Sequence, residues 1–430
     1  MKMDKKDWWM FLLGLFYLTQ INVIGYLGIS ELACYFFAPY LLVKHRQLLA
    51  KWGMLPFIYL SALWGVFALI SCVWNENPWF SILKGFAPAY TFFAEGVCVF
   101  CLLHDSPLRL KWGILGMTLS WFLSIFVFQT GSSSAVAEIT GVSALEAVVD
   151  YKLFWVMLVH LVTSLPIRLA FLHIPLSVSL ILTGGAAIFS VLQGGRSAFA
   201  MRLVTMYLLI LGNKLKSRRP QALKVNIVLL MAGLLICSVI SKNIYVYLAR
   251  HNYLKAEEIE KYEKQSSHGT TTTVTKLLMG GRGGTIAGVL IAAKTPILGR
   301  GYRPIDRNEE YLAFVEKYSS DDEELKRIRE AYRKGYIELP SHSHIVEGWI
   351  QAGFGGLIFW LYILWVLIKA VKNNLFIVPE WFGYLAVILP TVFWDIFFSP
   401  IAKRVELSVV IVCCLMLNRL GEMRKRGRVL

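Results

Sequence analysis

Two histidines and a glutamate stand at the start of a long apolar run, in the stretch PSHSHIVEGWIQAGFGGLIFW at residues 340–360. Pro and Ser commonly begin helices, so we expect Ser341 to cap a helix whose first turn holds His342 and His344, with Glu347 one turn further on. Near neutral pH an imidazole can take a proton from a hydroxyl or, once protonated, bind an anion. A single histidine here would indicate a membrane-interface anchor, but two beside a glutamate favour a functional site.

Small residues follow these groups along the predicted helix. Gly353 and Gly356 come about three and four helical turns after His342, so we expect all three residues on one face. Glycines on such a face let a neighbouring helix approach closely.

Arginines beside glycines occur in two other stretches. They are Arg196 in SVLQGGRSAFAMRL, and Arg282, Arg300 and Arg303 in MGGRGGTIAGVLIAAKTPILGRGYR, where Gly299 and Gly301 surround Arg300. Glycine-rich backbone before a helix offers N–H groups to an anion, and guanidinium groups bind phosphate oxygens in pairs. We therefore expect anion binding. The alternatives are an arginine that reaches lipid headgroups, for Arg196, and a solvated turn, for the second stretch.

Membrane helices are the elements that would position these groups. Hydrophobic residues make up 56% of the 430 residues, and the mean hydropathy is +0.56. Apolar runs of about 17–25 residues recur, which is the length that crosses a hydrocarbon core of roughly 30 Å. The predicted fold class is all-α, a polytopic membrane bundle of about twelve transmembrane helices with one large, mostly helical periplasmic loop. The spans are expected near residues 8–24, 26–43, 54–73, 86–104, 112–130, 153–171, 174–193, 197–213, 226–244, 344–368, 381–398 and 405–420.

The distribution of Lys and Arg predicts the orientation. With a cytoplasmic N-terminus, the basic segments KHRQLLAK, LRLK, KLKSRRPQALK, KAVKNN and the C-terminal tail all fall on the cytoplasmic side. The short loops opposite hold only Lys84, Lys152, Arg196, Lys403 and Arg404. The net charge of +16 is then a topology signal, and nucleic-acid binding is not needed to explain it. We also expect no cleavable signal peptide, because the first apolar segment is too long.

Three units follow from this pattern. They are an N-terminal transmembrane bundle at 1–244, a large periplasmic loop at 245–343 and C-terminal transmembrane helices at 344–430. Within the loop, YLKAEEIEKYEKQ and DDEELKRIREAYRKGY are typical of solvated helices, and residues 284–294 of a short apolar one. Function usually lies where one large loop interrupts a tightly connected bundle.

The cysteines and the intramembrane acids carry less information. Cys98 and Cys101 form a CxxC, but inside the apolar stretch EGVCVFCLL this spacing predicts small apolar packing. No metal-type spacing occurs, and no cofactor is expected. Glu31, Glu95 and Asp395 must find partners inside the bundle, because a buried carboxylate is costly.

The order of these motifs resembles the O-antigen ligase and polymerase superfamily, the polytopic glycosyltransferases of bacterial surface polysaccharides. QGGRSAF is similar to the family's arginine turn, GGRGGTIAGVLIAAKTPILGRG to its periplasmic segment ending in hPLLGxG, and His342–Val346 with GFGG to its HNxxL and GxxG motifs. The motifs cover roughly residues 175–370. Four positions depart from the pattern: Ser343 replaces Asn, Val346 replaces Leu, Ile286 replaces Trp and Arg300 replaces an apolar residue.

The resemblance implies metal-independent transfer of a glycan from an undecaprenyl-diphosphate carrier to an acceptor hydroxyl, at the periplasmic face of a bacterial inner membrane. His342, Arg196 and Arg282 would be catalytic, and the substrate would contact Arg300, Arg303, His344, Glu347, Gly299 and Gly301. The acceptor is a lipid A core for a ligase, which we favour, or another lipid-linked repeat for a polymerase. A transporter of lipid-linked glycans is the alternative of a different class, although no internal repeat supports it.

Overall fold

The structure is a computed structural model of the chain. It describes residues 3–17, 19–22, 26–122, 175–192, 196–216, 227–254, 259, 284–318, 322–334, 339, 343–373, 381–399, 401 and 403–425. This part of the chain is mostly helical, as the sequence predicts. The exception is a short antiparallel pair, β1 (Gln20–Asn22) and β2 (Tyr26–Gly28), in which Ile21 lies opposite Leu27.

The helices fall into an N-terminal, a middle and a C-terminal group. The first group is α1 (Lys5–Leu15), α2 (Ile29–Lys44), α3 (Arg46–Lys51), α4 (Leu55–Trp74), α5 (Trp79–Leu103), the 3₁₀ turn η1 (Pro107–Arg109) and α6 (Leu110–Phe122). The middle group is α10 (Leu176–Leu192), α11 (Arg196–Lys216), α12 (Ile227–Arg250), α15 (Glu310–Tyr318) and α16 (Asp322–Arg333). The last group is α17 (His344–Lys372), α18 (Phe382–Phe398) and α19 (Lys403–Lys425).

Among the described residues, three helices are long and apolar enough to cross a membrane: α4, α5 and α17. α4 and α5 coincide with the predicted spans 54–73 and 86–104. α17 covers the predicted span 344–368, but Ala352 and Gly353 interrupt it, so the predicted continuous helix is wrong at this point. The apolar helices α10 and α18 coincide with two further spans but are shorter, with 17 residues each. The predicted span 153–171 and part of 112–130 lie outside the described residues.

The first two predicted spans are wrong in detail. α1 has 11 residues and ends at Leu15, so no helix continues through residues 8–24. The chain instead pairs as β1 and β2, because QINVIGYLG combines β-branched and aromatic residues with glycines that suit a turn. α2 then has 16 residues, short of the roughly 20 that a span needs.

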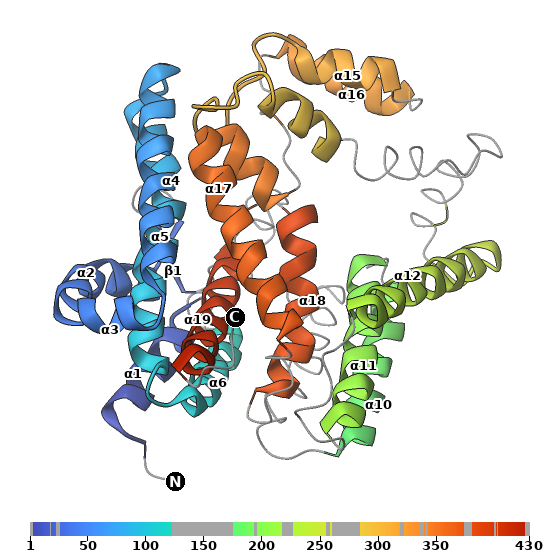
Figure 1. The fold of residues 1–430 in the computed structure, drawn as a ribbon. Helices are drawn as coiled ribbons and strands as arrows, with labels where there is room; N and C mark the ends of the chain where they lie inside the picture. Colours follow the sequence, from blue (N-terminus) through green and yellow to red (C-terminus); the bar gives the residue numbers. More distant parts are fainter. Residues whose placement is uncertain are drawn as a thin grey trace.

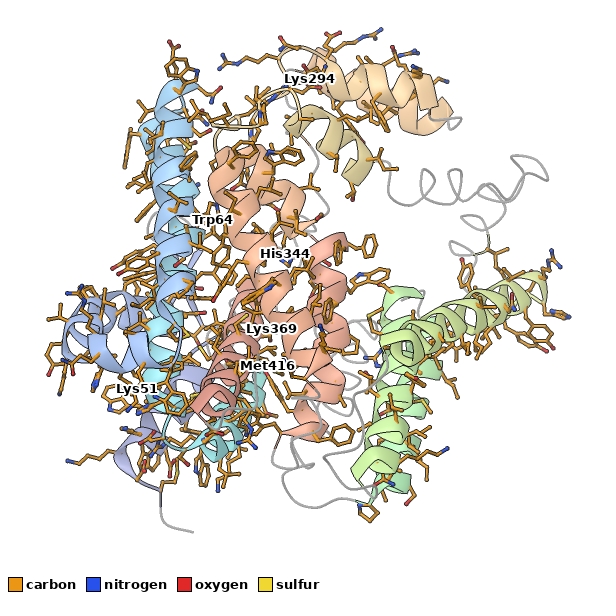
Figure 2. The ribbon with its side chains drawn as sticks, viewed as in Figure 1. Lys51, Trp64, Lys294, His344, Lys369 and Met416 are labelled. Atoms are coloured by element: carbon orange, nitrogen blue, oxygen red, sulfur yellow. The ribbon has the colours of Figure 1, made fainter. Side chains whose placement is uncertain are left out.

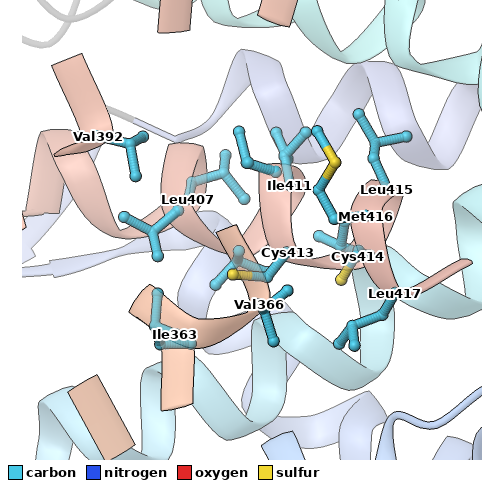
Figure 3. Packing of buried hydrophobic residues seen from close by; sticks show 14 of the residues in the cluster. Ile363, Val366, Val392, Leu407, Ile411, Cys413, Cys414, Leu415, Met416 and Leu417 are labelled. Atoms are coloured by element: carbon cyan, nitrogen blue, oxygen red, sulfur yellow. The ribbon is translucent and has the colours of Figure 1, made fainter. Parts of the chain in front are cut away.

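The apolar core lies where α4, α5, α17, α18 and α19 meet (Figure 1). Trp64 of α4 packs against Phe92 of α5 and against Phe359 and Trp360 of α17, with ring centroids 5.0–6.0 Å apart. Residues 407–416 of α19 are buried on every side, as is typical of a helix that is apolar all round. Figure 3 shows this helix enclosed by side chains such as Ile363, Val366 and Val392.

The loop between α12 and α17 is partly described. Residues 284–292 are helical, and α16 occupies most of DDEELKRIREAYRKGY, so both of these predicted helices are confirmed. Figure 1 shows α15 and α16 together beyond one end of α17. Asp306 holds the two helices together, because its Oδ2 accepts hydrogen bonds from Tyr332 Oη (2.5 Å) and Tyr311 N (2.7 Å).

All seven cysteines are buried and unpaired. Cys98 and Cys101 lie in the core around α5, in agreement with the packing role predicted for this CxxC. Among the buried acids, Glu31 has a backbone partner, since its Oε2 accepts the N–H of Gly28 at 2.9 Å.

Candidate functional site

α17 is two helical segments joined by a sharp kink. Ala352 (φ −131°, ψ 20°) and Gly353 (φ 53°, ψ −139°) are not helical, and the chain turns back on itself there. His344 consequently stacks on Trp360, with ring centroids 4.8 Å apart and planes 16° apart. In a straight helix these residues would be separated by roughly 24 Å along the axis. We call residues 344–360 the α17 hairpin.

The hairpin corrects two sequence predictions. The helix begins at His344 rather than His342, and its cap is Ser343 rather than Ser341, because Ser343 Oγ accepts the N–H of Val346 at 3.4 Å. Because the helix is broken at Gly353, the residues beyond it do not continue the face on which position 342 was expected. The partner that approaches Gly356 is the hairpin's own first segment, since a Cβ there would lie 2.1 Å from the Gly348 carbonyl oxygen.

The loop PILGRG, residues 296–301, clamps the kink. Three backbone hydrogen bonds join them: Phe354 N to Ile297 O (3.1 Å), Arg300 N to Ile350 O (2.6 Å) and Gly301 N to Gln351 O (3.1 Å). Broken helices in membrane proteins persist where neighbouring groups satisfy the freed backbone N–H and C=O groups, and this loop does so. Two stretches that the sequence singled out separately therefore form one unit.

Gly299 and Gly301 make this contact sterically possible. Both have positive φ, +75° and +84°, and a Cβ at Gly299 would lie 2.6 Å from the Gly353 nitrogen. The backbone N–H groups of Arg300 and Gly301 are already donated to α17, so they are not free to receive an anion in this arrangement. Backbone N–H groups at these two positions therefore could not bind an anion, and only side chains of this loop could. The glycine-rich backbone before the helix at 284, where donors were also expected, lies outside the described residues.

The turn between α4 and α5 meets the same loop. Asn77 Nδ2 donates to the Tyr302 carbonyl oxygen at 3.4 Å. Asn75 Nδ2 donates to the Gly299 carbonyl oxygen at 3.5 Å. Tyr302 N in turn donates to Cys72 Sγ at 3.3 Å. Sequence analysis missed these asparagines, although the polar stretch NENP between two apolar runs is a signal that could have indicated them.

Cationic side chains in and around the PILGRG loop pair with Glu310 or lie exposed. Arg300 Nη2 is 2.7 Å from Glu310 Oε2, and Lys294 Nζ is 3.2 Å from Glu310 Oε1. Arg303 is exposed, with φ +44°, and its guanidinium lies 5.7 Å from the centroid of the Tyr302 ring. Arg300 and Arg303, which the sequence grouped as anion ligands, thus differ in access: Arg303 is exposed, whereas the side chain of Arg300 is largely buried against Glu310.

His344 and Glu347 lie apart from these cations. His344 is 1% exposed, and Figure 2 shows it deep in the bundle, far from Lys294. Glu347 accepts hydrogen bonds from Gln351 Nε2 (2.9 Å) and from Ile401 N (2.7 Å) in the turn between α18 and α19. Ser343 Oγ donates to Ile396 O at 2.9 Å. In this arrangement the first segment of the hairpin is tied to α18 and to the turn that follows it.

The three residues predicted to be catalytic are not tested by this geometry. His342 and Arg282 lie outside the described residues, and Arg196 is described only as the first backbone position of α11. Their neighbours in sequence are placed, however. His344 begins α17 directly after its cap, and the helix at 284–292 follows Arg282 in sequence and leads into the PILGRG loop.

No family model matches the chain, and no curated protein or solved structure matches it either. The structure therefore supports only a broad class. The described part of the chain is mostly helical, and three of its helices are long and apolar enough to span a membrane.

Proposed function

We propose that the protein is a membrane glycosyltransferase that moves a glycan from an undecaprenyl-diphosphate carrier to an acceptor hydroxyl. The observation that carries the proposal is the backbone contact between the PILGRG loop and the kink of α17. This contact joins two of the three motifs on which the resemblance to the O-antigen ligase and polymerase superfamily rests. It lies at one end of membrane-length helices, where a lipid headgroup would be presented.

In the proposed reaction the acceptor oxygen attacks the anomeric carbon of the lipid-linked sugar. The bond from that carbon to the phosphate oxygen breaks, and undecaprenyl diphosphate leaves with the bonding electrons. The acceptor hydroxyl loses its proton to a base. Two tasks fall to the protein: it must stabilise the charge that develops on the diphosphate, and it must take the proton.

Arginines are assigned the first task. Arg196 and Arg282 are proposed to contact the diphosphate, since guanidinium groups bind phosphate oxygens in pairs and stay protonated. Arg300 stands on the clamped loop and Arg303 just after it, where they would hold the headgroup at the membrane surface. Removing one such contact typically costs about 10²–10³ in rate.

His342 is assigned the second task. Glu347 is the other candidate base, but both of its carboxylate oxygens already accept hydrogen bonds, one from Gln351 and one from Ile401 N. The carboxylate is therefore engaged in tying the first segment of the hairpin to the turn between α18 and α19. His344 stacks on Trp360, and its role in the proposal is to support the hairpin on which His342 would stand.

The acceptor is proposed to be a lipid A core, which makes the protein an O-antigen ligase of a bacterial inner membrane with cytoplasmic termini and a periplasmic site. The alternative acceptor, a second lipid-linked repeat, would make it a polymerase. Neither reaction calls on a metal or another cofactor in this proposal.

Transfer by the purified chain tests the proposal. Protein in lipid nanodiscs would receive an undecaprenyl-diphosphate-linked glycan with either lipid A core or a second lipid-linked repeat, and products would be read by mass spectrometry. We expect glycan on the core, and a rate at least about 10²-fold lower for Arg282→Ala. His342→Ala is expected to lower the rate by about 10²-fold or more, as loss of a general base does, and His251→Ala, at an exposed histidine, is its control. In sealed proteoliposomes, movement of the glycan lipid across the bilayer without bond cleavage would contradict the proposal and indicate a transporter.

A further inference from the structure

One carboxylate at the outer side of the PILGRG loop is shared by two cations. Glu310 Oε2 lies 2.7 Å from Arg300 Nη2, and Glu310 Oε1 lies 3.2 Å from Lys294 Nζ. The side chains of Arg300 and Glu310 are each 14% exposed, while that of Lys294 is 58% exposed. The cluster is therefore open to solvent on the lysine side and closed on the arginine side.

Arg300 is held rigidly in this cluster. Its own N–H donates to the Ile350 carbonyl, and the glycines on either side have positive φ, so its backbone cannot move without breaking the clamp on the kink. Its guanidinium has donors left over, because Nε is buried and has no hydrogen-bond partner. A buried donor without an acceptor is costly, and such a group in a native site calls for an explanation.

Glu310, in contrast, belongs to a different element. It is the first residue of α15, a helix of the outer loop that is joined to α16 through Asp306. The ion pair therefore connects Arg300 on the PILGRG loop to the first residue of α15, a helix whose Tyr311 and Phe314 pack against the first segment of the α17 hairpin. Rotation of the Glu310 side chain would withdraw the carboxylate and leave both cations in place.

We propose that Lys294 and Arg300 form a binding site for a phosphate-class anion, and that Glu310 occupies this site in the absence of the ligand. A carboxylate gives each cation one oxygen. A phosphate or diphosphate presents more oxygens and more charge, so it would engage both cations and also the unused Nε of Arg300. The choice of a diphosphate headgroup as the natural ligand rests on the proposed function, whereas the anion site itself does not.

The other charges near this segment fit an exchange of anions. Arg303 and Arg307 are exposed and add two positive charges, and Glu309 is exposed and adds one negative charge. Asp306 is buried, with its Oδ2 accepting hydrogen bonds from Tyr332 and Tyr311. Ligand and Glu310 compete for the same two cations. The apparent affinity is then the intrinsic affinity reduced by the fraction of molecules in which Glu310 has withdrawn.

Substitution of Glu310 is expected to raise the affinity for pyrophosphate, which would not happen if the ion pair were purely structural. Inorganic pyrophosphate would be titrated by calorimetry into the full chain in phosphatidylcholine nanodiscs. Glu310→Gln is expected to bind pyrophosphate about fivefold more tightly than the wild type, because the competitor is gone. Lys294→Gln is expected to bind it about fivefold more weakly or not at all.

Controls separate this effect from a general change in charge. Glu330→Gln removes the exposed carboxylate that pairs with Lys334 on α16, and it is expected to leave the affinity unchanged. An affinity in Glu310→Gln equal to or weaker than that of the wild type would overturn the proposal, as would the absence of pyrophosphate binding to both proteins.

A second arm identifies the source of the anion. In nanodiscs that also contain undecaprenyl diphosphate, the lipid headgroup is expected to occupy the site and abolish pyrophosphate binding. Undiminished binding would overturn the lipid headgroup as ligand and leave a soluble phosphate compound. Neither arm requires turnover, so loss of glycosyl transfer with intact pyrophosphate binding would contradict the proposed function alone.

Discussion

Gly353 shows how one residue sets the shape of the candidate site. Its φ of +53° with ψ of −139° lies outside the regions open to residues with a side chain, and it ends the first segment of the α17 hairpin. A Cβ at this position would lie 2.0 Å from the Ile297 carbonyl oxygen. Both the backbone angle and the approach of the PILGRG loop thus require glycine here.

We predict that Gly353→Ala destabilises the protein by about 3 kcal/mol or more, because it combines a forbidden backbone angle with a collision. The measurement is thermal or denaturant unfolding of the purified protein in detergent. Gly185→Ala on α10 is the matched control, since nothing lies within 4 Å of a Cβ there, and alanine favours a helix by up to about 1 kcal/mol. Equal stability of the two variants would contradict the structural role of the kink.

At the scale of elements, α1 is held by close packing against α6, where a Cβ on Gly14 would lie 2.2 Å from the Gly113 carbonyl oxygen, and by ion pairs at its N-terminal end. Arg109, in the turn after α5, is 8% exposed and lies 2.9 Å from Asp4 and 3.3 Å from Asp7. It also pairs with Asp105, which Lys6 contacts at 2.8 Å. The hydrogen bond from Arg109 lowers the pKa of Asp4. Burial would raise the pKa of Asp105, but hydrogen bonds from Lys6 and Arg109 outweigh it and lower that pKa.

These directions predict how the docking of α1 depends on pH. Carboxylates whose pKa is lowered by folding stabilise the folded state fully above their unfolded pKa of about 3.8, and that stabilisation is lost as pH falls through the lower folded pKa. A nitroxide attached at Trp8→Cys should stay immobile from neutral pH down to about pH 4 and become mobile below it. Asp105→Asn should weaken this response. A mobility that is constant down to the lowest pH would contradict the role of the cluster.

The elements also show what sequence could predict. Long continuous apolar runs predicted α4 and α5, because length and apolar composition are the main requirements of a membrane-spanning helix. The same signal failed for residues 8–28, where hydropathy could not distinguish an apolar helix from a β pair. It failed again at Gly353, because the kink depends on a loop about fifty residues earlier in the chain. Long-range backbone contacts of this kind leave no periodic pattern in the sequence.

The candidate site could be predicted only in part: the motifs that meet were identified, but the contacts between them were not. The resemblance grouped PILGRG with HSHIVEGW, and the structure brings the PILGRG loop against the helix that HSHIVEGW begins. The resemblance could not predict that the backbone N–H groups of Arg300 and Gly301 would donate to α17. Nor did the sequence analysis single out Glu310, whose ion pairs with Arg300 and Lys294 depend on the folded path of the loop.

For the whole molecule, exposed lysines lie toward both ends of the bundle and can report its orientation in the membrane. Figure 2 shows Lys294 near α15 and α16 at one end, and Lys51 near the other. The proposed orientation puts Lys294 outside and Lys51 in the cytoplasm. All seven native cysteines are buried, so a thiol introduced at either lysine can be labelled selectively.

We predict that a membrane-impermeant maleimide labels Lys294→Cys in intact cells, whereas Lys51→Cys is labelled only after the membrane is permeabilised. Both lysines are exposed, so the two variants are matched for access. The unmodified protein gives the background from its native thiols. Labelling of both variants from the same side, or of Lys51→Cys alone in intact cells, would contradict the proposed orientation.

The central claim, glycosyl transfer by this chain, is tested most directly on a gel of surface polysaccharide from a strain of the source organism that lacks the gene. Complementation with the wild type should restore a full ladder on lipid A core. Arg196→Ala, expressed at normal levels, should leave bare core with polymer stranded on its lipid carrier. A core capped by a single repeat would indicate a polymerase. A full ladder with Arg196→Ala would contradict the account, because that arginine would then be only a membrane anchor.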